Sequence, residues 1–482
     1  MSGSLFFIEV IYILVLILVC AKIVYDTRDP FKTTAYLLLA IFIPLIGIVI
    51  YFVFGINYRK RSIYSKKLVG DEKGSQLIRK KLVAFSADNV SNEHTEVRYA
   101  QSLVKLLMND SLSPLTIGNN VSLLINGEQK FPEMLAAIDQ ARNYIHLEYY
   151  IYEDDDIGNR LKNMLIKKAR QGVRVRFIYD DLGSRSIRKT IVPELRKGGV
   201  EAYPFNQVTF SLLANRINYR NHRKIIIIDG SVGFVGGINI TDRYANTTQK
   251  TKYWRDTHLR IDGSCVLFLQ HIFLCDWNFC SGQNIEHDSK FFPENISAQG
   301  TYSMQIASSG PDSPSATIML SFLKAIQLAQ EEIVITTPYF IPPASILDAL
   351  KAASLGGVNV KILVPGISDT LLVNHAAWTN YGDMMEGGVE IYLYQKGILH
   401  AKTMVVDNAF SIVGTANMDI RSFDLNFEVN AIIYSSDFAQ KLRTVFYNDI
   451  SHATQLSYDV WEKRPLFVKM LQKLAALLSP LL

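Results

Sequence analysis

Two histidines, each with a lysine two residues later and an aspartate seven residues later, carry the chemistry that this sequence can do. The residues are His222, Lys224 and Asp229 in HRKIIIID, and His400, Lys402 and Asp407 in HAKTMVVD. Each motif continues to a Gly-[Gly/Thr]-x-Asn stretch, which ends at Asn239 after the first copy and at Asn417 after the second. One short motif of this kind arises easily by chance, but two copies in a colinear repeat do not.

Two imidazoles at one site suit a displacement in two steps. A neutral histidine attacks and forms a covalent intermediate, while a protonated histidine gives its proton to the leaving oxygen and later takes one from the acceptor. Two lysines and two asparagines around the same point supply positive charge and donors for a phosphoryl group. Neither motif lies beside an Asp-rich loop or an HxxH-type cluster, so the sequence predicts no metal and no cofactor.

Two acidic residues stand at matching places downstream of the motifs. Asp256 lies in WRDTHLRIDG and Glu428 lies in NFEVNAIIYS. Each can orient an imidazole and fix its tautomer, as the acid of a catalytic triad does. The sequence leaves open whether each carboxylate serves the histidine of its own half or that of the other half.

A buried strand must hold the first motif. The β-branched run after His222 is typical of such a strand, and residues i and i+2 of a strand point to the same face. His222 and Lys224 therefore share a face at the start of the strand. Asp229 and the glycine after it have the composition of a turn that ends the strand, and the same parity places Asp229 off the face of His222.

The body of the chain repeats itself. NYIHLEYYIY (143–152) matches EEIVITTPYF (331–340), and QGVRVRFIYDD (171–181) matches GGVNVKILVPG (356–366). Strands that alternate with helices predict βαβ units. We therefore expect an α/β fold of two lobes related by a pseudo-two-fold axis, with mixed, mostly parallel sheets. The lobes comprise about 111–300 and 301–460, and the two histidines face each other across one cleft.

Two apolar stretches precede the lobes. Residues 5–25 and 35–56 each have the length that a helix needs to cross the hydrocarbon core of a bilayer. They predict a transmembrane hairpin over 1–58, and not a cleaved signal peptide, because no basic region precedes the first stretch. Positive charge follows in a basic linker, 59–110. By the positive-inside rule it places the lobes on the cytoplasmic side of the cell membrane.

The carboxyl end predicts an amphipathic helix over 461–482. Its apolar residues keep helical spacing, with Lys469 and Lys473 off the stripe. Two interpretations remain open at this point. The helix docks on the second lobe, or it lies in the interface of a bilayer.

Composition limits the class of protein. The formal net charge of +5 is low for a nucleic-acid-binding protein of 482 residues, so no nucleic-acid partner is expected. A hydrophobic fraction of 49% with 20% charged residues excludes a disordered chain. The four cysteines lack CxxC spacing and predict free thiols in a reducing compartment.

The doubled HxKx4Dx6G[GT]xN motif resembles that of the phospholipase D superfamily. The flanking segments NYRNHRKIIIIDG, WRDTHLRIDG and RSFDLNFEVN, together with the paired apolar stretches, resemble bacterial cardiolipin synthases. The resemblance covers essentially the whole chain. It implies two phospholipase D-like lobes that act on membrane phospholipids, without implying an oligomeric state.

The resemblance also implies an activity and a role for each residue. One phosphatidylglycerol gives its phosphatidyl group to His222 and releases glycerol, and a second phosphatidylglycerol then attacks to give cardiolipin. His400 acts as general acid and base, the lysines and asparagines bind phosphate, and Asp229 and its counterpart in the second motif lie behind the cleft as supports. The alternatives are a phospholipase D-type hydrolase with water as acceptor, a nuclease of the same superfamily, and a membrane scaffold without activity.

Overall fold

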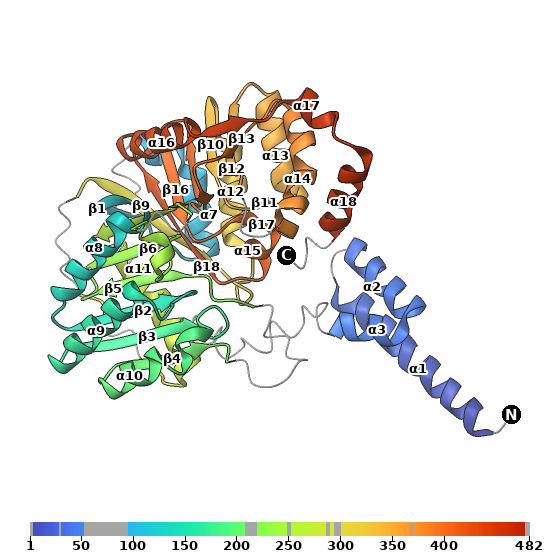
Figure 1. Ribbon diagram of the computed structural model, residues 1–482, viewed down its shortest axis with the longest axis horizontal. Coiled ribbons are helices and arrows are strands. Elements are labelled where there is room, and N and C mark those ends of the chain that lie inside the picture. Colours follow the sequence, from blue (N-terminus) through green and yellow to red (C-terminus); the bar gives the residue numbers. More distant parts are fainter. Residues whose placement is uncertain are drawn as a thin grey trace.

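The computed structural model describes most of the chain, in eight ranges: 3–27, 30–52, 95–207, 219–247, 252–285, 290–293, 300–367 and 371–477. Most of the predicted basic linker, residues 59–94, lies outside them. Figure 1 shows a body of two lobes with the N-terminal helices to one side.

The first three helices form a unit of their own. They are α1 (Gly3–Asp26), α2 (Pro30–Phe42) and α3 (Pro44–Ile50). The second apolar stretch is broken before Pro44, because a proline inside a helix removes a backbone donor and clashes with the preceding turn. Among the residues that the structure describes, no helix combines the length and apolar character that a membrane crossing requires. The two transmembrane spans therefore stay a prediction.

One continuous sheet of fifteen strands runs through both lobes. The first lobe contributes β1 (Thr116–Ile125), β2 (Tyr144–Tyr149), β3 (Arg174–Asp180), β4 (Glu201–Phe205), β5 (Lys224–Ile228), β6 (Val232–Gly236) and β8 (Thr257–Asp262). The second lobe contributes β9 (Tyr302–Ser309), β10 (Glu332–Thr336), β12 (Asn359–Pro365), β13 (Glu390–Tyr394), β15 (Thr403–Val406), β16 (Phe410–Gly414), β18 (Glu428–Tyr434) and β19 (Ala453–Gln455). Apart from β19, the two sets repeat the same spatial order outward from the pair β1–β9, which joins the lobes.

The prediction of a mixed sheet in two repeated lobes is confirmed, but the balance of strand directions differs from the expected one. In the described part of this sheet, four strand pairs are parallel and ten are antiparallel. Helical crossovers produce parallel pairs only among the first strands of each lobe. After each motif strand the chain returns by a tight turn, from β5 to β6 and from β15 to β16, and such turns join antiparallel neighbours.

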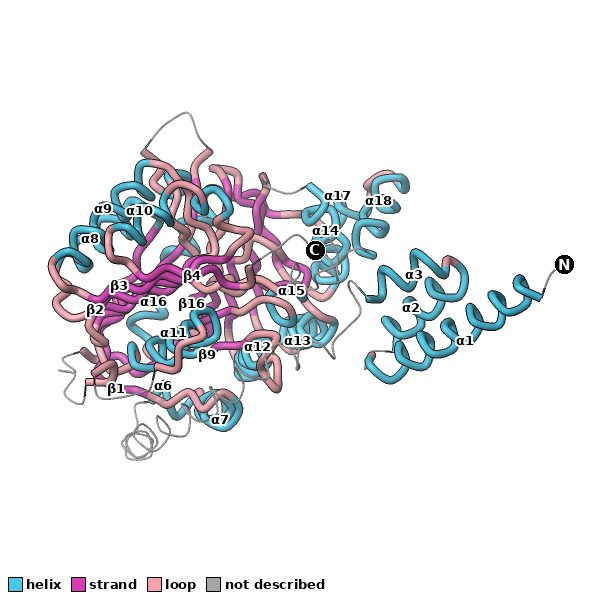
Figure 2. Tube along the Cα trace, turned by 90° about the horizontal axis from the view of Figure 1, so that it is seen from below, coloured by secondary structure: helices cyan, strands magenta, loops and turns pink. Residues whose placement is uncertain are grey.

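Helices cover both faces of the sheet (Figures 1 and 2). In the first lobe they are α8 (Asn126–Asp139), α9 (Asp156–Arg170), α10 (Ile191–Lys197) and α11 (Val266–Ser281). In the second lobe they are α12 (Thr317–Leu328), α13 (Ala344–Leu355), α14 (Leu371–Glu386), α15 (Ile420–Asp424) and α16 (Ser436–Ile450). Two short helices after them, α17 (Tyr458–Glu462) and α18 (Leu466–Leu477), lie against α14.

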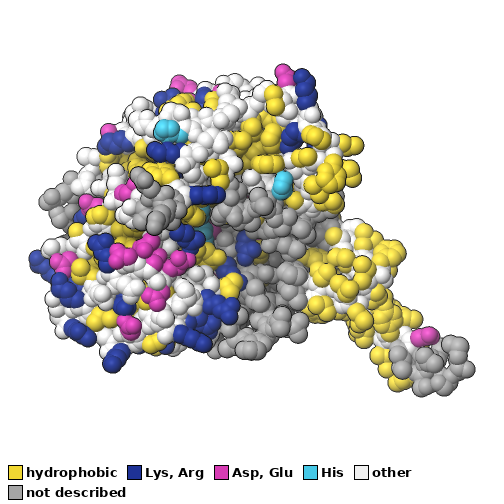
Figure 3. All heavy atoms as spheres, viewed as in Figure 1, with side chains coloured by type: hydrophobic (Ala, Val, Ile, Leu, Met, Phe, Trp, Pro, Cys, Tyr) yellow, Lys and Arg dark blue, Asp and Glu magenta, His cyan; other side chains and the backbone are white. Residues whose placement is uncertain are grey.

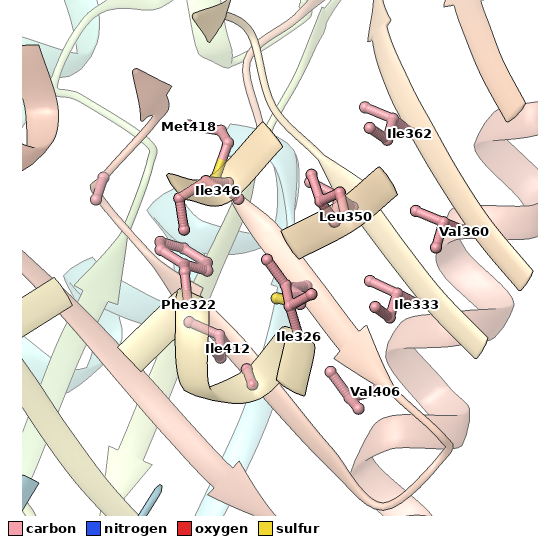
Figure 4. Packing of buried hydrophobic residues seen from close by; sticks show 14 of the residues in the cluster. Phe322, Ile326, Ile333, Ile346, Leu350, Val360, Ile362, Val406, Ile412 and Met418 are labelled. Atoms are coloured by element: carbon pink, nitrogen blue, oxygen red, sulfur yellow. The ribbon is translucent and has the colours of Figure 1, made fainter. Parts of the chain in front are cut away.

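The isoleucines of β5 are buried on both faces of the sheet. Ile225 and Ile227 belong to a core shared by the two lobes, which includes residues of α11 and α16. Ile226 and Ile228 belong to the core beneath α8, α9 and α10. Burial on both faces explains why this strand lacks the alternation of apolar and polar residues. Figure 4 shows the corresponding core of the second lobe, where Val406 of β15 packs near Ile333.

Residues 95–110, which the sequence placed in the linker, are part of the second lobe. They form α6 (Thr95–Tyr99) and α7 (Gln101–Asp110). Val97, Leu103 and Leu107 are buried in the core of that lobe. The polar residues around the two helices concealed this apolar face, which needs α12 and β9 beside it to be buried.

Candidate active site

Short backbone pairings across the lobes hold both motif histidines. The N–H of His222 donates to the carbonyl of Phe427 at 2.9 Å, and the N–H of Phe427 donates to Arg220 at 2.8 Å. In the mirrored arrangement, β14 (Ile398–Leu399) pairs with β7 (Trp254–Arg255). The N–H of His400 then donates to the carbonyl of Arg255 at 2.7 Å. Each histidine is thus fixed beside a strand start of the opposite lobe.

This pairing brings the carboxylate of the opposite lobe to the first histidine. Glu428 follows Phe427 directly, and both its oxygens lie near Nδ1 of His222, at 2.9 and 3.0 Å. The carboxylate is itself held by two donors, the Thr415 hydroxyl at 2.5 Å and the Asn426 amide at 3.2 Å. Glu428 is fully buried. Its orientation is therefore fixed on both sides.

The second histidine has the equivalent partner from the first lobe. Nδ1 of His400 lies 2.7 Å from Oδ2 of Asp256, which directly follows Arg255. The Tyr244 hydroxyl lies 3.3 Å from the same nitrogen. The rings of Tyr244 and Trp254 pack around the imidazole, with centroids at 5.9 and 5.6 Å. The question left open by the sequence thus has a geometric answer, because both carboxylates contact the histidine of the other lobe.

The motif lysines lie beside their histidines, but not through the predicted strand parity, because β5 begins at Lys224 and β15 at Thr403, so that both histidines precede the strands. Nζ of Lys224 donates to the carbonyl of His222 at 2.7 Å and lies 5.4 Å from the centre of the Tyr150 ring. Nζ of Lys402 lies 2.9 Å from Nδ1 of His400 and also donates to the carbonyl of that residue. Both lysines are buried. The site therefore concentrates positive charge where a phosphate could be bound.

The two asparagines are near the motifs but are engaged by neighbours. The Asn239 amide donates to the Tyr244 hydroxyl at 3.1 Å, which connects it to His400. The Asn417 amide donates to Asp419 at 3.1 Å. Their role as phosphate ligands stays a prediction.

The motif aspartates lie at the opposite end of their strands. The carboxylate of Asp229 accepts from the backbone N–H groups of residues 142, 143 and 144, at 2.8 to 2.9 Å. Asp407 accepts in the same way from residues 330, 331 and 332 and from the Tyr99 hydroxyl. Both residues have positive φ, 51° and 48°, at the turn after the strand. Their contacts identify them as supports of the neighbouring strands β2 and β10 and not as groups that touch the histidines.

Burial and charge separate the two histidines. Burial lowers the pKa of His222 well below its usual value, and the charges of Lys224 and Lys402 lower it further. Burial and Lys402 also lower the pKa of His400, but the hydrogen bond and charge of Asp256 oppose that shift. His222 is therefore the imidazole that stays neutral, and His400 is the one whose protonated form has an ionised partner.

The pKa values of the two carboxylates shift in opposite directions. Burial raises the pKa of Glu428 to about 7. Although burial also raises the pKa of Asp256, the charge of Lys402 and the hydrogen bond to His400 outweigh it, and the net shift is downward. Burial lowers the pKa of Lys224 to about 7. The site thus holds two groups, Glu428 and Lys224, whose charge changes near neutral pH.

A buried charge network behind His222 was missed by sequence reasoning. Arg223 forms an ion pair with Asp276 of α11 and donates from Nε to the carbonyl of Glu428 at 3.3 Å. Glu148 of β2 accepts from the amide of Asn221. The only sequence signal was the charged residue between His222 and Lys224, which in the second motif is Ala401.

The fold and the paired histidines define a phospholipase D-like enzyme. A family model described as "Cardiolipin synthase, PLD-like domain" matches residues 134–252 and 322–450. A second, described as "Phospholipase_D-nuclease N-terminal", matches residues 10–55. The solved phosphatidylserine synthase of Haemophilus influenzae Rd KW20 superimposes with a TM-score of 0.60 over 79% of this chain and 100% of its own, at 16% identity, and so shares the fold.

Two bacterial relatives match the chain over its whole length. The cardiolipin synthase of Listeria monocytogenes serotype 4b (strain CLIP80459) is 42% identical over 100% of both chains. The cardiolipin synthase of Alkalihalophilus pseudofirmus is 39% identical over 100% of this chain and 94% of its own. The chain belongs to the cardiolipin synthase family, and its general reaction is phosphatidyl transfer.

Proposed function

We propose that this enzyme transfers a phosphatidyl group from one phosphatidylglycerol to another, giving cardiolipin and glycerol through a phosphatidyl-histidine intermediate. The observation that carries the proposal is the crossed pairing of histidines and carboxylates. It gives each imidazole a carboxylate from the opposite lobe at Nδ1, and this orientation supports the use of one as nucleophile and the other as acid and base in a two-step displacement.

In the first step Nε2 of His222 attacks the phosphorus. The N–H at Nδ1 faces Glu428, which leaves the lone pair of Nε2 free for attack. The bond from phosphorus to the oxygen of the headgroup glycerol breaks, and the protonated His400 donates its proton to that oxygen. Lys224 and Lys402 stabilise the charge that spreads over the phosphoryl oxygens, and Asn239 and Asn417 are the proposed amide donors to the same group.

In the second step the terminal hydroxyl of another phosphatidylglycerol attacks the phosphorus. His400, now neutral, takes the proton of that hydroxyl, and the bond from phosphorus to Nε2 of His222 breaks. Atoms and charge balance, since one hydroxyl replaces another on the same phosphorus. The enzyme returns to its first state without a metal or a cofactor in the scheme.

The experiment is a product assay on the purified enzyme with radiolabelled phosphatidylglycerol. Cardiolipin and glycerol in equal amounts are expected, whereas phosphatidic acid as the main product would establish the hydrolase instead. Rapid quenching in alkaline detergent, in which the acid-labile P–N bond survives, should trap label on His222, and on no residue in His222→Ala. Label on His400 in the wild-type enzyme would reverse the two roles.

We further propose that the enzyme is attached to the cell membrane with its lobes on the cytoplasmic side. The exposed apolar side chains of α1 to α3, among them Leu14, Leu18 and Leu45, support contact with the hydrocarbon region. The basic residues after Ile56 support the sidedness. Labelling of a cysteine introduced at the exposed Leu355 by an impermeant reagent should need permeabilised cells, and labelling of intact cells would contradict this topology.

A further inference from the structure

The last described helix, α18, has one apolar face on the second lobe and another in solvent. Ala475 is buried in the core of that lobe, and Gln472 beside it is also buried. A stripe on the other side is between 45% and 74% exposed and comprises Leu466, Phe467, Met470, Leu471 and Leu474. The two interpretations of this helix from the sequence are therefore compatible, because docking on the lobe leaves the larger apolar face uncovered.

The orientation of the exposed stripe is fixed by the contacts of the helix. Trp461 packs edge-on against Trp378 of α14 with a centroid distance of 5.9 Å. Arg464 lies over the Trp461 ring and donates from Nε to its carbonyl at 2.7 Å. Nη1 of the same arginine donates to Gln472 at 2.8 Å. These bonds tie the start of α18 to α14, so the stripe belongs to the folded lobe.

Positive charge borders the stripe. Lys469 and Lys473 lie one residue before Met470 and Leu474, so they follow one edge of the apolar face on the helix surface. Lys469 also forms an ion pair with Glu462 at 2.7 Å, whereas Lys473 is exposed. Lys463 is exposed just before the helix. An apolar face beside lysines is the pattern of a helix that lies in the interface of an anionic bilayer.

The rest of the molecule agrees with this orientation. Figures 1 and 2 both place α18 at the end of the body that faces α2 and α3. Figure 3 shows hydrophobic side chains gathered at this end, over the last helices and over the N-terminal ones. An apolar surface of this kind on one side of a soluble lobe marks a site of interaction.

We propose that α18 docks the second lobe on the surface of an anionic phospholipid bilayer, with the stripe among the acyl chains and the lysines at the headgroups. The inference rests on the proposed function only in that the substrate is a bilayer lipid. It adds a second attachment besides α1 to α3. Two attachments restrict how the lobes can turn above the membrane.

Spin labels test the docking without using the reaction. The full chain carries Cys20→Ala and Cys280→Ala, since the other two cysteines are buried, and is reconstituted in vesicles of phosphatidylglycerol and phosphatidylcholine. A nitroxide at Met470→Cys should collide more with oxygen than with a water-soluble nickel chelate. The matched control is Leu355→Cys on α13, also exposed, and it should show the reverse.

Two results would overturn the proposal. One is an aqueous collision pattern at Met470→Cys equal to that at Leu355→Cys. The other is a label at Met470→Cys that neither oxygen nor the nickel chelate reaches and whose spectrum is broadened by a label on another molecule. This result would show that a second copy of the chain covers the stripe. Equal immersion in pure phosphatidylcholine vesicles would remove the role given to the lysines. Because the same readings are expected in His222→Ala, their failure is distinguishable from failure of the proposed reaction.

A kinetic test gives an independent readout. The substitutions Met470→Asp and Leu474→Asp together should raise the KM for phosphatidylglycerol at the vesicle surface by at least about tenfold, since two apolar side chains lose their burial, and should leave kcat nearly unchanged. Leu355→Asp should alter neither constant. A fall in kcat as large as the expected rise in KM, with KM itself unchanged, would contradict a docking role.

Discussion

The carboxylate of Glu428 offers the sharpest test of the site, because it can be changed in two graded ways. Glu428→Gln keeps the shape and an oxygen acceptor, but removes the charge. Glu428→Ala removes both. In Glu428→Gln the amide NH2 would face the Thr415 hydroxyl. That hydroxyl can donate to the carbonyl of Val429 at 3.2 Å instead, and its oxygen can then accept from the amide. The glutamine variant therefore separates the charge of Glu428 from its orienting effect on His222.

The expected magnitudes follow from the hydrogen bonds to His222. A hydrogen bond to a charged group contributes about 1.5–3 kcal/mol and a neutral one about 0.5–1.5 kcal/mol. Loss of the charge alone should cost about 1.4 kcal/mol, which is roughly a tenfold fall in the rate of phosphatidyl transfer to His222. Loss of the whole bond should cost about 3 kcal/mol, which is about 100-fold or more.

The pH dependence of the deficit has a predictable sign. Burial raises the pKa of Glu428 to about 7, so the carboxyl loses its charge as the pH falls through that value. His222 stays neutral there, because its own pKa is well below the usual value. The difference between wild-type and Glu428→Gln enzymes should therefore be largest above pH 7 and should shrink toward pH 6.

The assay is a rapid-quench measurement of glycerol release and of the labelled enzyme, at pH values from 6 to 8. Glu428→Gln should slow the burst of glycerol release, with Glu386→Gln, an exposed glutamate of α14, as the matched control. Equal rates for Glu428→Gln and Glu428→Ala would refute the separation of charge from orientation. A deficit that grows toward pH 6 would refute the assigned ionisation of Glu428.

Three further predictions concern pH and stability. Because burial lowers the pKa of Lys224 to about 7, the lysine loses its charge as the pH rises, and the profile of kcat/KM against pH should be bell-shaped near pH 7. Glu428→Gln should remove the acidic limb of that profile and leave the basic limb. A profile of the variant in which both limbs survive would contradict the prediction. Asp229→Ala removes three charge-assisted hydrogen bonds and should lower the free energy of unfolding by about 4.5 kcal/mol, at about 1.5 kcal/mol for each bond, seen as a lower Tm in detergent, without changing kcat at low temperature. Burial and the charge of Asp276 raise the pKa of Glu148 well above its usual value, so Glu148→Gln should change Tm little. Asp276→Asn removes the ion-pair partner of the buried Arg223 and should lower the free energy of unfolding by about 3–5 kcal/mol. Comparable decreases of Tm in the two variants would contradict the assignment of the charges.

Much of the site was predictable because the signals are local. The motif spacing predicts that His222 and Lys224 lie together and that Asp229 lies at the turn, although His222 precedes β5 and does not belong to it. The pairing of β5 with β2 and β6 then agrees with the apolar run, and Asp229 bonds the start of β2. The same reasoning holds for the second motif, since the repeat carries the same pattern of residue types.

The features that the sequence did not predict depend on contacts between distant segments. Nothing near Glu428 indicates that it contacts His222, because that contact depends on the backbone pairing of Asn221 with Phe427 across the lobes. The apolar face of α7 is recognisable only beside α12 and β9. The antiparallel majority of the sheet follows from how the chain returns after each motif strand, which hydrophobic periodicity does not encode.

The crossed carboxylates also explain why both halves of the duplication must stay together. Each lobe supplies the orienting acid for the imidazole of the other, at 2.7 Å for Asp256 and 2.9 Å for Glu428. A lobe on its own would hold a histidine and a lysine on the correct strand but would leave the tautomer of the imidazole unspecified. The pairing of β1 with β9 keeps the lobes in one sheet. The unequal surroundings of the two acids support the proposed division of the equivalent histidines into a nucleophile and a proton donor.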